Sequence, residues 1–260
     1  MTTDTSEKGL ETLIMRHMTG VDGLAVMPNM VTEPPAPYGG TGYFAGSPKD
    51  YDRTHALDVP QLFAFLRVTQ PEVFKKLAMT DANDSKDINR LKFLDRVSSE
   101  IGKRGVIDVL RKGIEHHPAG HFDLFYGTPS EGNAKAEALH VQNRFSITRQ
   151  LAYSNDETRR SLDLGLFING LPIGTFELKN SLTKQTVEDA VEQYRRDRDP
   201  REKLFEFGRC VVHFAVDDSE VKMCTELKGK GSWFLPFNKG YNDGAGNPPN
   251  TQGLKTDYLW

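Results

Sequence analysis

Hydrophobic and polar residues alternate between Ser161 and Asn180, where the chain reads SLDLGLFINGLPIGTFELKN. A period of two is typical of β-strands, whose successive side chains point to opposite faces of a sheet. One side of the first predicted strand is aliphatic: Leu162, Leu164, Leu166 and Ile168. One side of the second is apolar or small: Gly174, Phe176 and Leu178. The segment therefore predicts a hairpin around Asn169-Gly170.

The other side of each predicted strand is polar, with Asp163 in the first and Glu177 and Lys179 in the second. Their relative placement depends on the loop, because a shift of one residue in register flips every side chain. A two-residue turn at Asn169-Gly170 would pair Asp163 with Phe176 and separate the carboxylates. A loop with an odd number of residues, such as a type I turn followed by Gly170 in the left-handed conformation with a bulge, would bring Asp163 opposite or diagonal to Glu177. We expect the odd loop, because it also places both aliphatic stripes on one face.

Two neighbouring carboxylates repel each other unless a positive group lies between them, and Mg²⁺ prefers oxygen ligands. Lys179 is placed to orient or activate a water, or to neutralise charge on a phosphate. The chemistry indicated is metal-assisted hydrolysis of a phosphodiester. The alternative is a half-exposed hairpin with an ordinary Asp, Glu and Lys, because short acidic patterns are frequent and need confirmation from their context.

Several flanking segments extend this pattern: Asn143-Arg144-Phe145, Thr148-Arg149-Gln150-Leu151, LFINGLP, FELKN, DAVEQYRRDRDPRE and FGRCVVHFAVDD. In order and spacing, over roughly residues 50 to 260, the chain resembles the PD-(D/E)xK nuclease core at the N-terminus of the R (HsdR) subunit of type I restriction-modification enzymes. The resemblance implies an α/β, restriction-endonuclease-like fold, with a central mixed sheet flanked by helices and a helical layer or insertion.

The resemblance also implies a type I site-specific deoxyribonuclease. Asp163 and Glu177 would bind Mg²⁺, with Mn²⁺ as an alternative ion, helped by the Leu178 carbonyl, and Lys179 would be the catalytic lysine. The substrate would be unmodified double-stranded DNA, cut after ATP-driven translocation in complex with methylation (M) and specificity (S) subunits. Two alternatives stay open: a catalytically silent domain that docks on DNA or on other subunits, and a stand-alone nuclease.

A helix is predicted after the lysine, capped by Thr186, with an apolar stripe formed by Val187, Ala190, Val191 and Tyr194. Its other face carries Gln193, Arg195, Arg196 and Arg198, which we expect to contact DNA phosphates. The alternative is a solvated face whose arginines pair with Glu192, Asp197 and Asp199. Many members of the family carry Gln-x-x-x-Tyr here, whereas Tyr194 directly follows Gln193 and Asp197 takes the fourth place. The role of that tyrosine therefore does not transfer to this chain.

The N-terminal segment predicts a short helix, because Leu10, Leu13, Ile14 and Met18 recur at helical spacing. A Gly- and Pro-rich loop is expected from Pro28 to Pro48. Related nucleases often place an additional acidic residue on a helix before the core, so Glu11, with Glu7 as the alternate, is expected to approach the metal. The competing interpretation is a solvated helix glutamate.

The remaining patterns, taken with the resemblance, suggest four regions: residues 1–47, the N-terminal helix and loop; 48–120, a helical layer or insertion; 121–226, the nuclease core; and 227–260, a C-terminal segment. The resemblance implies that this last segment leads to an absent ATP-dependent translocase. Three helical patterns lie between Val59 and His116: VPQLFAFLRVT, LKFLDRVSSEIGKR and GVIDVLRKGIEHH. Strands are expected at Phe122–Tyr126 and Arg144–Tyr153.

Histidine and cysteine add little to the predicted metal chemistry. HHPAGH, from His116 to His121, has a loop sequence and no fourth ligand, so zinc binding is not favoured. His213 is expected to be a core histidine with a hydrogen-bond partner. Cys210 and Cys224 flank a predicted hairpin around Asp217-Asp218, and without a secretory signal we expect reduced thiols in the cytoplasm.

Composition limits the functional classes. The chain has 260 residues, a formal charge of −3 and 37% hydrophobic residues, enough for one sizeable core or two small ones. A protein that coats DNA is usually basic, so any DNA contact must be local. Gly253-Leu254-Lys255-Thr256 lacks the glycine that a Walker loop needs before its lysine, so ATP is expected to bind only in an absent motor domain. The aromatic end at Tyr258-Leu259-Trp260 suggests an N-terminal fragment of a longer protein.

Overall fold

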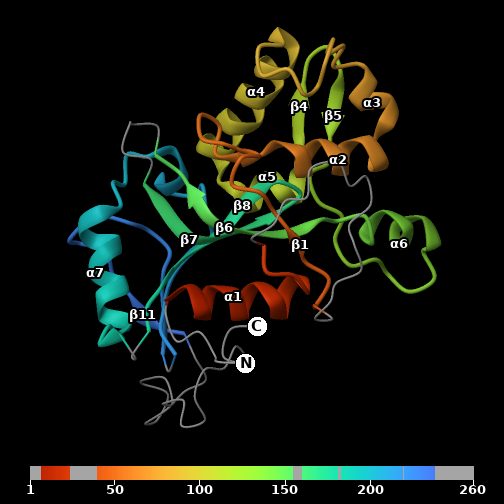
Figure 1. The fold of residues 1–260 in the computed structure, drawn as a ribbon. Helices are drawn as coiled ribbons and strands as arrows, with labels where there is room; N and C mark the ends of the chain where they lie inside the picture. Colours follow the sequence, from red (N-terminus) through yellow and green to blue (C-terminus); the bar gives the residue numbers. More distant parts are fainter. Residues whose placement is uncertain (1–6, 24–39, 155–159, 181–182, 219, 238–260) are drawn as a thin grey trace.

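The fold is taken from a computed structural model, which describes residues 7–23, 40–154, 160–180, 183–218 and 220–237. Within these ranges the centre is a seven-stranded mixed sheet in the order β1-β6-β7-β8-β9-β10-β11 (Figure 1). The strands are β1 Phe44–Ala45, β6 Phe145–Ala152, β7 Ser161–Ile168, β8 Leu171–Leu178, β9 Val212–Val216, β10 Val221–Cys224 and β11 Leu235–Pro236. β1 pairs with β6 and β8 with β9 in parallel, and the other neighbours are antiparallel. The predicted α/β architecture with a central mixed sheet is confirmed.

Two helices cover opposite faces of this sheet. α1, Glu7–Thr19, packs its buried Leu10, Ile14 and Met18 against a cluster that includes Phe214 of β9. α7, Val187–Asp197, packs against the next residue of β9, Ala215, whose side chain points to the other face. Both helices were predicted. Because helices cover both faces of the sheet, β7 and β8 have no solvent-exposed polar side.

A second layer lies beside the sheet, above it in Figure 1. It contains α2 Val59–Thr69, α3 Pro71–Lys75, α4 Ile88–Arg104 and α5 Val106–Lys112, with the strand pairs β2 Tyr51–Asp52 with β3 Leu57–Asp58 and β4 Ile114–His116 with β5 Gly120–Phe122. α6, Ala134–His140, follows. The core of this layer includes Leu171 of β8. Because Leu171 follows the turn between β7 and β8, the layer supports this hairpin at its turn end.

Two predicted elements in this region are wrong. The helix expected through His116 ends at Lys112, because Gly113 has a φ of 62° and a Cβ there would lie 2.2 Å from the Phe122 carbonyl oxygen. The residues after it form β4 instead. The strand expected at Phe122–Tyr126 lies earlier, at Gly120–Phe122. The short helices α3 and α6 were not predicted.

The four predicted regions share elements in the structure. A boundary at residue 120 falls inside the β4–β5 hairpin, and the sheet takes β1 from the first region and β11 from the last. β1 also lies within the segment expected to be a loop up to Pro48. Residues 28–39 of that segment and Gly253–Thr256 lie outside the described residues. Along the ranges that are described, no helix has the length and apolar character to cross a bilayer.

The hairpin of β7 and β8 has a two-residue turn, so the predicted odd loop is wrong. Asn169 and Gly170 have φ values of 50° and 79°, as a type I′ turn requires, and Ile168 pairs with Leu171. The register then shifts between Leu166 and Phe167, which leaves Ile173 as an extra residue in β8. Pro172 has no N–H to donate to a ladder, which favours a bulge next to it. The bulge has the same effect on the register as the predicted odd loop. Odd-numbered residues of β7 again lie opposite odd-numbered residues of β8, as Gly165 lies opposite Thr175.

Other loops hold this turn in place. The side chain of Asn169 donates to the Leu124 carbonyl at 2.9 Å and accepts from the backbone N–H of Arg144 at 2.6 Å. The backbone N–H of Asp58 donates to the Gly170 carbonyl at 2.9 Å. The Asn143-Arg144-Phe145 segment thus supports the turn, and the turn fixes the register on which the polar face of β8 depends.

Candidate metal and catalytic site

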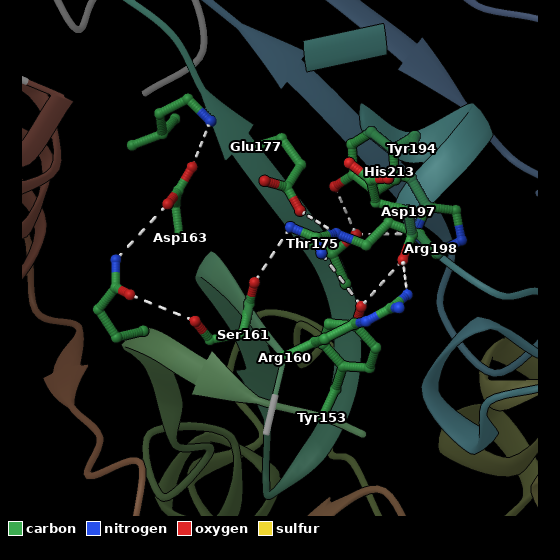
Figure 2. Close-up of polar contacts among 12 residues, drawn as sticks. Tyr153, Arg160, Ser161, Asp163, Thr175, Glu177, Tyr194, Asp197, Arg198 and His213 are labelled. Atoms are coloured by element: carbon green, nitrogen blue, oxygen red, sulfur yellow. Dashed lines mark hydrogen bonds and ion pairs between the residues drawn. The ribbon is translucent and has the colours of Figure 1, made fainter. Parts of the chain in front are cut away.

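Asp163 lies where the sheet opens on both sides. The pairing of β6 with β7 skips Gln150 and Asp163, and the pairing of β7 with β8 begins one residue later, at Leu164 with Phe176. In place of a ladder bond, Oδ2 of Asp163 accepts the backbone N–H of Leu178 at 2.7 Å (Figure 2). The opening leaves room for a carboxylate between strands that would otherwise be joined by backbone hydrogen bonds.

Glu177 lies on the adjacent strand with its side chain fully buried. Its Oε1 accepts from Nε of Arg198 at 2.5 Å, whereas its Oε2 is buried and has no hydrogen-bond partner among the described residues. Burial raises the pKa of the Glu177 carboxyl; the Arg198 guanidinium opposes this rise and the Asp163 charge adds to it. An oriented buried oxygen without a partner requires an explanation, and a cation is one.

Lys179 is two residues beyond Glu177 and is itself buried, with 8% of its surface exposed. Its backbone N–H donates to the Val216 carbonyl at 2.8 Å, which extends the β8–β9 pairing. The Lys179 charge acts on Glu177 and counteracts the rise in the pKa of that carboxyl. The predicted Asp163, Glu177 and Lys179 thus occupy one region of the sheet.

Glu11 reaches the same region from α1. It is 2% exposed, its Oε1 pairs with Nε of Arg149 at 2.6 Å, and its Oε2 accepts from Nε2 of Gln150 at 3.0 Å. The same Nε2 lies 3.5 Å from Oδ1 of Asp163. The interpretation of Glu11 as a solvated glutamate is therefore wrong, and metal coordination by Glu11 stays a prediction. The side chain of Glu7 lies outside the described residues.

Gln150 is a residue that the sequence did not single out. Its φ of 50° is unusual for a residue with a side chain and falls inside a strand, directly opposite Asp163. Such outliers tend to occur at functional sites. In its rotated position the carboxamide touches both Glu11 and Asp163, and its Oε1 lies 3.4 Å from the Ser161 hydroxyl.

The basic face predicted on α7 is only partly exposed. Arg196 is 68% exposed in its side chain, Gln193 is half-buried, and Arg195 contacts Glu192 and the Ser232 carbonyl. Pairing of Arg195 and Arg196 with Glu192 matches the solvated-face alternative. Arg198 does not belong to this face, because its side chain is 6% exposed and bonded to Glu177. The expectation that it faces DNA is therefore wrong.

A buried hydrogen-bond network holds α7 against β8 and β9. The Thr175 hydroxyl lies 2.8 Å from the Tyr194 hydroxyl and 2.8 Å from Nδ1 of His213 (Figure 2). Burial lowers the pKa of His213 to about 3, so the imidazole is neutral at pH 7. His213 is the core histidine that was predicted, and Tyr194 fixes the helix that Arg198 directly follows.

The contacts of His121 and the burial of the two cysteines involve neither Asp163 nor Glu177. His121 pairs with Glu115 through Nδ1 at 2.8 Å and with Asp123 through Nε2 at 3.4 Å. Among the described residues no group of three potential ligands from His, Cys, Asp and Glu is close enough to hold a metal alone. Cys210 and Cys224 are buried free thiols.

The residues at the centre fit a hard divalent cation. Asp163 and Glu177 supply carboxylate oxygens, which Mg²⁺ prefers, and Oε2 of Glu177 has no other partner in the described part of the chain. A cation bound by only one or two carboxylates is usual for Mg²⁺, which keeps several waters and binds substrate phosphate. Residues 181–182, just beyond Lys179, are outside the described ranges.

A mixed α/β sheet with these carboxylates and a lysine at its opening is consistent with a nuclease-like fold. The family model for the type I restriction enzyme R protein N terminus matches residues 79–232, more than half of the chain, and the chain belongs to this family. A type I restriction enzyme MjaIXP endonuclease subunit from Methanocaldococcus jannaschii is 33% identical over 80 residues, which cover 31% of this chain. The match spans 7% of that relative's length.

Proposed function

We propose that the chain forms a PD-(D/E)xK nuclease domain that hydrolyses phosphodiester bonds in double-stranded DNA with Mg²⁺. The observation that supports this most strongly is the bulge at Ile173 in β8. By restoring the parity of the hairpin, it turns Glu177 and Lys179 toward the position of Asp163. A chain of the R protein family with this set of side chains is better explained as a nuclease than as a scaffold.

In this proposal Asp163 and Oε2 of Glu177 bind the Mg²⁺, with the Leu178 carbonyl as a further ligand and Mn²⁺ as an alternative ion. When bound, the ion supplies Lewis-acid stabilisation of charge on the phosphate and lowers the pKa of a bound water. Asp163 is held in place by the Leu178 N–H, and Glu177 by Arg198. Lys179 orients the attacking water or neutralises charge on the phosphate oxygens.

DNA would approach α7 through its remaining polar residues, Gln193, Arg195 and Arg196. Arg196 is the most exposed of the three, and arginine forks bind phosphate oxygens in two-point contacts. The formal charge of −3 for the whole chain means that such a contact must be local. Arg198 has no part in it, because its guanidinium is buried.

The family description leads us to propose a wider setting for the domain. The R protein would carry an ATP-driven translocase in addition to this domain, and it would work with methylation (M) and specificity (S) subunits of a type I restriction complex. Cleavage would then fall on unmodified DNA after translocation. The relative named as an endonuclease subunit supports a nuclease within such a complex.

The experiment is plasmid cleavage by the full R protein, assembled with its M and S subunits, with and without Asp163→Ala. We expect cleavage to fall at least about a hundredfold while ATP hydrolysis is retained, because loss of a metal ligand removes the chemistry and leaves the motor. Asp84→Ala is the control, since Asp84 is exposed in a surface turn. Unchanged cleavage by Asp163→Ala would favour a silent docking domain.

A further inference from the structure

Arg198 follows α7 directly and turns inward, whereas its neighbours in sequence turn outward. Its side chain is 6% exposed, compared with 68% for Arg196. A buried guanidinium is costly unless it is paired and fully hydrogen-bonded. The contacts that compensate this cost therefore indicate what the residue does.

The guanidinium makes three contacts, each with a different strand or strand end. Nε donates to Oε1 of Glu177 in β8 at 2.5 Å, and Nη2 donates to the carbonyl of Ser161, the first residue of β7, at 3.1 Å. Nη1 donates to the hydroxyl of Tyr153, just after β6, at 3.1 Å. Figure 2 shows Arg198 on one side of Glu177 and Asp163 on the other. The guanidinium is thus fixed from three directions.

In this arrangement the two carboxylate oxygens of Glu177 have different surroundings. Oε1 is committed to Arg198, while Oε2 is buried without a hydrogen-bond partner in the described ranges. If the carboxylate rotated, it would lose a charge-assisted hydrogen bond, which is about twice as strong as a neutral one. Glu177 therefore presents one oxygen, in one orientation, before any cation arrives.

We propose that Arg198 is a positioning residue of the metal centre, which holds Glu177 as a ligand through Oε2 alone. This inference rests on the proposed function, because it takes Glu177 to be a metal ligand. Arg198 touches neither the metal nor the DNA in this account. Its effect is on metal affinity, because a ligand that is already oriented loses less conformational freedom on binding.

The decisive variant is Arg198→Lys. A lysine keeps the positive charge beside Glu177 but lacks the planar fork, so it cannot hold Glu177, Tyr153 and Ser161 together. Arg198→Met removes the charge as well. Arg201→Lys is the matched control, because Arg201 lies three residues further along the chain and its side chain is 89% exposed.

The measurements are Mn²⁺ binding to each full R protein, followed by the electron paramagnetic resonance signal of free Mn²⁺, and thermal unfolding without metal. We expect Arg198→Lys to fold and to bind Mn²⁺ roughly tenfold more weakly, the scale found when a residue that supports a metal ligand is removed. Cleavage by Arg198→Lys should recover when Mg²⁺ is raised by the same factor. Arg201→Lys should match the wild type in both.

The outcomes separate the inference from the proposed function. If the folded Arg198→Lys protein binds Mn²⁺ as tightly as the wild type, Arg198 is only structural and the inference is overturned, even if cleavage by the wild type stands. If the wild type binds no Mn²⁺ and does not cut, both the nuclease proposal and the inference that rests on it fail. If Arg198→Met does not fold, the comparison of Arg198→Lys with Arg201→Lys still decides.

Discussion

At the scale of single residues, the candidate ligands are held in place by side chains that are not carboxylates. Gln150 lies between Glu11 and Asp163, and Arg198 holds Glu177. Loss of a residue that orients a metal ligand typically lowers metal affinity or activity by roughly 10- to 100-fold. The site therefore extends beyond the short Asp, Glu and Lys pattern that the sequence displays.

Gln150→Leu tests this wider site. Leucine has a similar size but no donor, so Glu11 and Asp163 would lose their shared hydrogen-bond partner. We expect DNA cleavage to fall roughly 10- to 100-fold, the range for loss of a residue that supports a ligand. Gln150 is itself exposed, but the buried Glu11 loses a hydrogen-bond partner, so we also expect a modest loss of thermal stability. Gln142→Leu, at another exposed glutamine, is the control, and equal cleavage by both variants would assign Gln150 no role.

Asp58 supports a prediction about pH and stability. It is 2% exposed, and its side chain caps the N-terminus of α2 by accepting the Gln61 N–H. Burial raises the pKa of Asp58 to about 7. The unfolded chain releases this proton near pH 4, whereas the folded protein keeps it to about pH 7. The folded state thus loses stability relative to the unfolded state as pH rises from about 4 to about 7, and above that range the loss is complete.

Asp58→Asn should remove this dependence, because asparagine caps a helix about as well and does not ionise. We expect the variant to be more stable than the wild type at pH 8, by on the order of a few kcal/mol, with the gain shrinking toward pH 4. Urea unfolding at several pH values measures it. A gain that is the same at pH 4 and pH 8 would contradict the assigned pKa; Asp84→Asn is the exposed control.

At the scale of elements, the β7–β8 hairpin decides which side chains meet. Its two-residue turn alone would place Glu177 on the face opposite Asp163, and the extra residue Ile173 reverses that result. The turn itself is fixed by the side chain of Asn169, which donates to the Leu124 carbonyl, and by the backbone N–H of Asp58, which donates to the Gly170 carbonyl. Turn and bulge are both needed for the candidate site.

Gly170→Ala should disrupt this hairpin. Gly170 has a φ of 79°, and a Cβ would lie 2.3 Å from the Asp58 carbonyl oxygen and 2.7 Å from the Leu62 nitrogen. Backbone atoms cannot move aside cheaply, so we expect a loss of about 2 kcal/mol or more in the free energy of unfolding. Gly127→Ala is the control, because a Cβ there meets nothing within 4 Å. A loss no larger than that of the control would contradict the tight packing of the turn.

The sequence predicted this hairpin's common polar face but not its cause. Period-two alternation places Asp163, Glu177 and Lys179 on polar sides, and this depends only on local spacing. The choice between an odd loop and a turn followed by a bulge depends on Pro172 and on contacts from Leu124 and Arg144, distant in sequence. α1, α2, α4 and α7 were predictable because their apolar residues recur every three to four positions.

Other features depended on tertiary contacts that no local pattern reports. Arg198 follows Arg195 and Arg196 in a basic run, and nothing in the spacing distinguishes it, although its helix has already ended at Asp197. Gln150 lies within a normal strand pattern, and its left-handed φ arises where the ladder opens at Asp163. The end of α5 at Gly113 was the exception, because a glycine directly after basic residues in the last turn is a recognisable helix stop signal.

At the scale of the whole molecule, the site is assembled from parts distant in sequence. Glu11 comes from the first helix, Asp163 and Glu177 from the central hairpin, and Arg198 from beyond α7. α1 and α7 cover opposite faces of the sheet, so the opening at Asp163 connects side chains from both faces. The helical layer packs on Leu171 and supports the hairpin from its turn end. Metal binding should therefore depend on the folded domain as a whole.

The most direct test is Mg²⁺ binding by calorimetry to the wild-type R protein and to Asp163→Ala, with the Asp84→Ala control. The account predicts that Asp163→Ala loses measurable binding at this site and cuts no plasmid DNA, while its unfolding transition and ATP hydrolysis remain those of the wild type. Mg²⁺ binding and cleavage by Asp163→Ala at wild-type levels would contradict the assignment of Asp163 as a ligand and the nuclease proposal built on it.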